Sequence, residues 1–327
     1  MNRLLLAVTL NLPLCVAQQP AAAPDAPSAS PAQGGRAGRA GRGPANDGAP
    51  RELPSNQETG VDIDRFIGYP STAFTKVLNG GLMTRSMLRN GDPYHPGPMG
   101  NVLEYRDECA VATLEPHFET GAMESQEIYF YYVQGGEGRV DSGPGTESYN
   151  LHAGVGVLLA AGAKQHFVNT GDKQLSMIMV TWKDNNGMIV KKPIKVVDSN
   201  TVPFGNNRAH WIHMGKQMFN ANDGINTVIS PIYFPPMSYG GPHAHVPGVE
   251  ELWVKVGSDE GYMILGSEIR KAVGNVAFLS PPNGKTTHSS MNLNEEHPSI
   301  WLYIAHRAPQ NSQSATSAAA APAGVSR

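Results

Sequence analysis

The strongest chemical signal in the chain is Gly241-Pro-His243-Ala-His245-Val-Pro-Gly-Val-Glu250, and a further histidine follows at His288. Two histidines one residue apart on a strand point to the same side, because side chains alternate along a strand. Glu250 follows a Pro-Gly turn and can return to that side. Two imidazoles, a carboxylate and a later imidazole suit a borderline divalent metal such as Fe, Mn, Ni or Zn. The stretch therefore predicts a site for one divalent metal ion.

Composition favours a globular protein rich in turns. The chain has 327 residues, of which 40% are hydrophobic and 16% are charged, with 36 Gly and 26 Pro. Such a composition suits a packed core with few long helices. The net charge of −3 gives no electrostatic reason to expect nucleic acid as a partner. A short basic run at Arg36, Arg39 and Arg42 lies among Gly and Ala, as in a solvated linker.

Residues 1–17 have the pattern of a signal peptide. A short positive region that ends at Arg3 precedes the apolar run Leu4–Leu14, and small Ala17 precedes the expected cleavage point. The run is too short for a bilayer, which needs about 20 residues. We therefore expect an exported protein, periplasmic or secreted, without an integral membrane segment after cleavage. Cleavage would leave Cys109 as the only cysteine, so we expect no intrachain disulfide.

The two ends of the chain differ in composition from its middle. Residues 18–60 are rich in Ala, Pro and Gly, with almost no large apolar side chains, and residues 309–327 are similar. Such segments cannot bury enough apolar surface to offset the entropy lost on ordering. We expect disordered tails around a folded region of 61–308.

The folded region reads as short strands separated by turns. Strand patterns rich in aromatic and β-branched residues end at glycines, and no helical periodicity accompanies them, which favours a sandwich or a small barrel. The patterns lie at 127–133, 154–159, 175–182, 252–256, 261–265, 274–279 and 300–304. Their order recurs after about 120 residues, as in an internal repeat. The predicted fold class is all-β, with an N-terminal barrel at 61–190 and a C-terminal barrel at 191–308.

The second copy resembles the cupin superfamily. His243-x-His245, Glu250 and Gly257 match the first motif of that family. Its second motif is similar to Gly274–Pro282 followed by Gly284, His288 and Asn292. The resemblance covers most of 225–304 and implies a double-stranded β-helix (jelly-roll) barrel in which His243, His245, Glu250 and His288 bind one divalent metal. With two copies the chain looks like a bicupin, and because cupins often pair barrels a homo-oligomer is a further expectation.

The first copy departs from this pattern. Thr120 and Ala122 stand where the paired histidines would be, and only Glu127 and His166 occupy ligand-like positions. A shifted pair, His117 with Glu119, could replace the missing histidines if the strand carries a bulge. The alternative is a degenerate barrel that has lost its metal.

Two expectations concern the surroundings of the metal. Strand alternation sends Glu251 and Trp253 to the face opposite Glu250, where Trp253 would pack between the barrels. Asn292 either orients His288 by a hydrogen bond or caps a turn.

Three functions are compatible with such a site. Three histidines and one carboxylate leave up to two positions of an octahedron open for substrate, water or dioxygen. The leading hypothesis is a metal-dependent oxidoreductase of the dioxygenase type that acts on a small organic molecule, with no catalytic residue beyond the metal ligands. The alternatives are a redox-silent isomerase or lyase, and a non-catalytic protein that binds a sugar or another small ligand.

Overall fold

The computed structural model describes residues 61–182, 187–206 and 214–307. The predicted signal peptide, the linker at 18–60 and the tail at 309–327 lie outside these residues. The regular elements of the described part are strands, apart from three short 3₁₀ helices. Among the described residues no helix is long and apolar enough to cross a membrane. The all-β prediction is confirmed.

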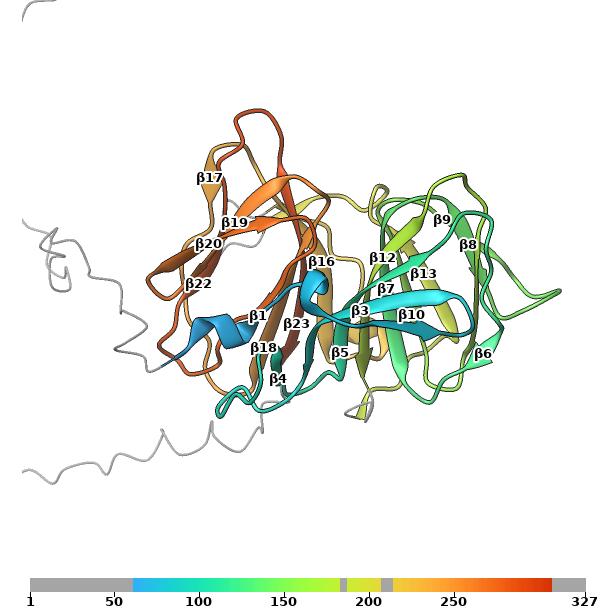
Figure 1. Cartoon of the computed structure of the whole chain (residues 1–327), viewed down its shortest axis with the longest axis horizontal. Helices are drawn as coiled ribbons and strands as arrows, with labels where there is room; N and C mark the ends of the chain where they lie inside the picture. The colour runs from blue at the N-terminus through green and yellow to red at the C-terminus, as the bar shows by residue number, and fades with distance from the viewer. Residues whose placement is uncertain (1–60, 183–186, 207–213, 308–327) are drawn as a thin grey trace, which may run out of the picture. The chain divides into compact units, whose positions relative to one another are not determined.

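The first half of the described chain forms two sheets that are antiparallel except where β4 pairs with β3 (Figure 1). The larger has the order β13-β10-β7-β12-β5-β3-β2, with β4 beside β3, and the smaller has the order β6-β11-β8-β9. Their bounds are β2 Thr75–Leu78, β3 Leu82–Asn90, β4 Asn101–Leu103, β5 Glu108–Leu114, β6 Met123–Glu124, β7 Ile128–Gly135, β8 Gly138–Asp141, β9 Tyr149–Leu151, β10 Val155–Leu159, β11 Lys164–Asn169, β12 Leu175–Trp182 and β13 Ile194–Asp198.

The second half repeats this arrangement. Its larger sheet has the order β1-β21-β18-β23-β16-β15-β14, and its smaller sheet has the order β17-β22-β19-β20. The bounds are β1 Ile67–Gly68, β14 Gly205–Asn206, β15 Met214–Gly215, β16 Thr227–Phe234, β17 Ser238–Tyr239, β18 Val249–Val256, β19 Glu260–Leu265, β20 Glu268–Val273, β21 Ala277–Leu279, β22 His288–Asn292 and β23 Ser299–Arg307. The 3₁₀ helices are η1 Ile63–Phe66, η2 Pro70–Thr72 and η5 Ala221–Asp223.

The two halves exchange strands at their edges. β1 comes first in the chain but pairs with β21 of the second half, and Ile67 lies opposite Phe278. β13 pairs with β10 of the first half over five residues. The sequence-based division at residue 190 assigned β13 to the second half, whereas its hydrogen bonds are with the first. β1 thus links the start of the first half to the second half, and β13 completes an edge of the first half.

The central strands are buried on both faces. In β12, Met177 and Met179 enter the core inside the first half, while Ile178 and Val180 enter a core shared by both halves. In β18, Trp253 lies inside the second half, while Leu252 and Val254 enter the shared core. This alternation follows from the period of two along a strand. The described residues thus form three apolar cores, one inside each half and one between them.

A buried ion pair crosses the shared core. Arg106, from the segment before β5, contacts the carboxylate of Glu250 on β18, and both side chains are almost fully buried. The same carboxylate accepts hydrogen bonds from the backbone N–H groups of Glu104 and Tyr105. Arg106 also donates to the carbonyl of Ile304 at 3.1 Å. Burial raises the pKa of Glu250, and the guanidinium opposes that rise.

The histidine opposite Glu250 is buried next to this pair. His306 faces Glu250 in the ladder between β18 and β23, and its ring stacks on Tyr105 with a centroid distance of 4.0 Å. Burial, reinforced by the charge of Arg106, lowers the pKa of His306 to about 4. The folded protein therefore holds this imidazole neutral at pH values where an ordinary histidine is charged.

His306 should make stability fall with decreasing pH. Below pH 6.5 the unfolded chain binds a proton on this ring, whereas the folded chain does so only near pH 4. Its contribution is therefore full above pH 6.5 and is lost toward pH 4, by up to about 1.4 kcal/mol per pH unit. The variant His306→Phe keeps an aromatic ring against Tyr105. Its free energy of unfolding, measured by urea denaturation at several pH values, should depend less on pH than that of the wild type. An equal pH dependence in both proteins would contradict the assignment.

Removing Arg106 alone should be costly. Arg106→Met leaves the Glu250 carboxylate buried without its countercharge, and we expect a loss of about 3–5 kcal/mol in the free energy of unfolding. The double variant Arg106→Met/Glu250→Gln removes that charge and keeps an acceptor for the two backbone N–H groups, so it should recover more than half of the loss. A double variant as unstable as the single one would contradict this role.

Candidate metal centre

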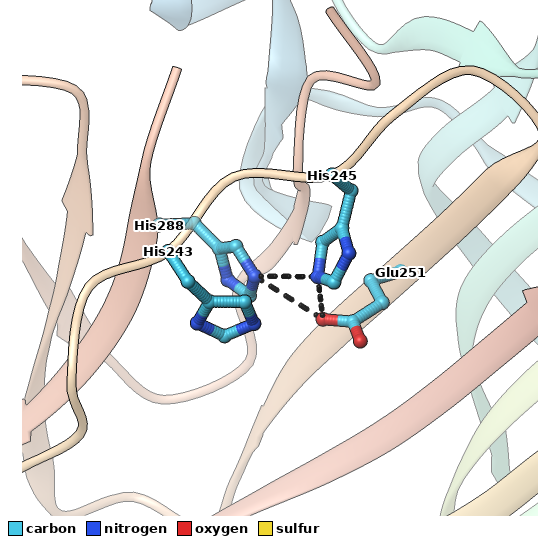
Figure 2. A group of neighbouring side chains, drawn as sticks. All are labelled: His243, His245, Glu251 and His288. Carbon is cyan, nitrogen blue, oxygen red and sulfur yellow. Dashed lines mark hydrogen bonds and ion pairs between the residues drawn. The ribbon is translucent and has the colours of Figure 1, made fainter. Parts of the chain in front are cut away.

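Four side chains of the second half converge on one point. They are His243, His245, Glu251 and His288, whose candidate ligand atoms all lie within 4.8 Å of one another (Figure 2). The Nε2 atoms of His245 and His288 are 3.1 Å apart. One oxygen of Glu251 lies 3.0 Å from the first nitrogen and 3.2 Å from the second. The structure therefore brings together all three predicted histidines, but with Glu251 in place of Glu250.

The prediction that Glu250 faces the histidines is wrong. Glu250 lies on the opposite face of β18, in the shared core with Arg106. The two glutamates do face opposite sides of β18, as strand alternation predicts, but it is Glu251 that faces the histidines. The segment of His243 and His245 is not a regular strand, and a turn at Pro247 and Gly248 precedes β18. Alternation cannot be counted across such a turn, because it holds only within a continuous strand.

Backbone contacts hold the histidine segment over β22. His243 forms an isolated bridge with His288, in which each residue's N–H donates to the other's carbonyl. The N–H of Gly284 donates to the carbonyl of His245 at 2.8 Å. Three ligand residues are thus fixed by hydrogen bonds between two segments about 40 residues apart in the sequence.

The donor atoms have the spacing of neighbouring ligands around one metal ion. Metal bonds of about 2.1 Å at right angles place two ligand atoms about 3 Å apart, close to the three separations observed here. His243 can also ligate the metal. Its Nδ1 lies 3.1 Å from the carbonyl of Gly241. That contact places the ring proton on Nδ1 and the lone pair on Nε2. The residues present therefore fit a divalent transition metal.

The Glu251 carboxylate is held by two further side chains. The Tyr303 hydroxyl donates to one oxygen at 2.9 Å, and the Trp253 indole N–H donates to the other at 3.3 Å. Burial by itself would raise the pKa of this carboxyl, but His245 and His288 outweigh burial and hold it well below its usual range. Trp253 therefore lies beside the site. The expectation that it packs between the barrels is wrong, because Trp253 shares the face of β18 that carries Glu251.

His288 forms the buried end of the group. Its side chain is 1% exposed, against 17% for His245. Burial lowers the pKa of His288 to about 4, so the ring is neutral at pH 7 and can ligate a metal without first losing a proton. The rings of Trp253 and Phe278 lie 6.1 and 6.3 Å from the His288 ring. One side of the site is thus apolar and closed, and the other is open at His245.

Among the described residues, no hydrogen bond joins the Asn292 side chain to His243, His245 or His288. Its amide group donates to the carbonyls of Phe234, Pro235 and His297, and its oxygen accepts from the N–H of Asn294. Asn169 makes the corresponding contacts with Leu114, Lys173 and Gly171 in the first half. Asn292 therefore caps a turn, which is one of its two predicted roles, and Asn169 does the same in the first half.

Of the predicted first-half residues, the structure brings together only Glu119 and His166. His117 is exposed and lies 3.0 Å from Asp172. His166 is buried, with its Nδ1 2.8 Å from Asp141 and its Nε2 3.5 Å from Glu119. Glu127 is absent from the cavity around His166. The structure brings His166 together with Asp141, which sequence analysis missed because nothing in a Gly-Arg-Val-Asp strand singles out its aspartate.

Comparison with solved structures identifies the fold. Protein YlbA from E. coli matches with a TM-score of 0.54 at 11% identity, over 73% of this chain and 89% of that chain. Oxalate decarboxylase from Lactobacillus farciminis matches with a TM-score of 0.52 at 13% identity, over 74% and 86%. Vicilin from Corylus avellana matches with a TM-score of 0.55 at 11% identity, over 74% and 85%. No family model and no curated protein matches the sequence.

These neighbours are cupin proteins, and the described chain has the fold of a tandem cupin. The internal repeat, two pairs of sheets and the His/Glu group inside the second half all agree with that assignment. At 10–13% identity the likeness establishes the fold and leaves the activity to be argued from the site.

Proposed function

We propose that the protein is an exported, metal-dependent oxidoreductase of the dioxygenase type that acts on a small organic molecule. The observation that carries the proposal is the group of three histidines and Glu251 inside the second half. Fe, Mn, Ni and Zn all accept such ligands. Export is inferred from the sequence of residues 1–17 alone.

The residues of the chain have distinct roles in this proposal. His243, His245, Glu251 and His288 would hold the metal, which supplies Lewis acidity and, for Fe or Mn, one-electron redox chemistry. Tyr303 and Trp253 orient the carboxylate. The rings of Trp253 and Phe278 exclude water from the His288 side, so substrate would approach from the more exposed side at His245.

A redox-silent lyase or isomerase is the second candidate. The observation in its favour is that the fold neighbours include oxalate decarboxylases from two bacteria. A further structural neighbour is an oxalate decarboxylase from Bacillus subtilis that contains Mn(II) centres. The same ligand types support Lewis-acid chemistry on a small carboxylic acid without net oxidation.

Replacing each of the two neighbouring glutamates by glutamine tests the metal site. Glu251→Gln should weaken Mn²⁺ or Zn²⁺ binding at least tenfold in calorimetric titrations, because it removes an anionic ligand. Glu250→Gln should retain the affinity, since that side chain lies on the opposite face of β18, although its lost pairing with Arg106 should lower the melting temperature. The reverse pattern would reinstate Glu250 as the ligand. A wild-type protein without a stoichiometric site would refute the proposal.

Oxygen consumption separates the candidate functions. With the native metal bound, the wild-type protein should consume dioxygen in the presence of a phenolic, enolic or dicarboxylic acid, and His245→Ala should abolish this consumption. Substrate loss without oxygen consumption would favour the lyase or isomerase. Ligand binding without any turnover would indicate a non-catalytic protein.

A further inference from the structure

The first half contains a cavity of about 580 Å³ with a buried polar floor. His166 and Asp141 form the floor and are 9% and 6% exposed. Glu119, Arg139 and the loop from Gly143 to Ser148 also line it. Its volume is typical of small-molecule sites. The cavity is separate from the metal centre, because all of its lining residues lie between Glu119 and His166.

One substitution in the repeat distinguishes this cavity from the metal centre. His166 on β11 faces Asp141 on β8, whereas His288 on β22 faces Leu265 on β19. The first half thus retains a histidine but adds a buried acid opposite it. Among the described residues, the group of side chains placed to bind one metal ion is that of His243, His245, Glu251 and His288 in the second half. This cavity therefore differs in its chemistry from the metal centre.

Asp141 fixes the orientation and tautomer of the His166 ring. One oxygen of the Asp141 carboxylate lies 2.8 Å from Nδ1 of His166 and also accepts the N–H of Gly143 at 2.8 Å. A carboxylate only accepts hydrogen bonds, so the neutral imidazole carries its proton on Nδ1 and its lone pair on Nε2. Nε2 lies 3.5 Å from the Glu119 carboxylate, whose side chain is 66% exposed. The cavity therefore offers two neighbouring hydrogen-bond acceptors, one of them anionic.

A guanidinium stands on the same side of β8. Arg139 is two residues before Asp141, and its Nε lies 3.4 Å from the second oxygen of that aspartate. Its side chain remains 44% exposed, and the residue lines the cavity. Guanidinium groups bind carboxylates through paired hydrogen bonds. The cavity thus has an acceptor pair and a cation that binds carboxylates.

We propose that this cavity binds a small zwitterion of the amino-acid class. The ammonium group donates to Nε2 of His166 and to Glu119, and the carboxylate is bound by Arg139. Asp141 serves as the positioning residue that keeps the His166 lone pair directed at the ligand. The net charge of the Glu119, Arg139 and Asp141 side chains is −1, which favours a ligand that presents a cationic group to the floor.

Calorimetric titration of the full-length, chelator-treated protein at pH 8 tests the proposal. The probes are the twenty common amino acids, with glycine as the smallest. Trimethylglycine is the matched control, because it keeps both charges but has no N–H donor, and acetate has the carboxylate alone. We expect at least one amino acid to bind with a dissociation constant below 1 mM, on the order of a typical metabolite site. Trimethylglycine and acetate should bind at least tenfold more weakly.

Variants show whether the named residues bind the ligand. Glu119→Gln alters an exposed side chain and should weaken binding at least tenfold with an unchanged melting temperature. Arg139→Gln should also weaken binding at least tenfold, but it removes the contact with buried Asp141 and should lower the melting temperature. Arg85→Gln removes an exposed arginine of β3 outside the cavity lining and should bind like the wild type. His166→Gln should abolish binding while Mn²⁺ affinity at the second half is retained. Absence of binding by all twenty amino acids at 10 mM, equal binding of trimethylglycine, or Mn²⁺ binding that depends on His166 would each overturn the proposal.

Discussion

The contact between Arg106 and Glu250 is the constraint on which the site depends. Glu250 receives a guanidinium and two backbone N–H groups from one short segment of the first half. A charge buried to this extent is tolerated only when it is paired and hydrogen-bonded. Because adjacent residues of a strand face opposite sides, fixing Glu250 in the shared core fixes Glu251 inside the second half. The first half therefore contributes to the metal centre without supplying a ligand.

The repeat has diverged by changing side chains on a conserved frame. Asn169 and Asn292 make equivalent backbone contacts in their turns, and His166 and His288 occupy corresponding strands. What differs is the neighbour of each histidine, which is Asp141 in one half and Leu265 in the other. A carboxylate that accepts a hydrogen bond fixes the tautomer of an imidazole, whereas an apolar neighbour does not. Two sites of different chemistry follow from one fold.

Much of the frame could be predicted from the sequence. The strand patterns at 175–182 and 261–265 correspond to β12 and β19, because glycines and aromatic or β-branched residues mark such strands clearly. The exchange of β1 and β13 between halves could not be predicted. Pairing partners of edge strands depend on which sheet edge is open in space, and short apolar strands carry little information on their partner.

The sequence by itself determined that His243, His245 and His288 belong together, since their spacing within two motifs carries the information. Only the tertiary structure decided which glutamate joins them. β18 is buried on both faces, so the apolar pattern that normally marks the inner side of a strand is absent around Glu250 and Glu251. The choice was made by Arg106, which lies 144 residues away in sequence and binds Glu250. An interaction of that range leaves no local pattern in the chain.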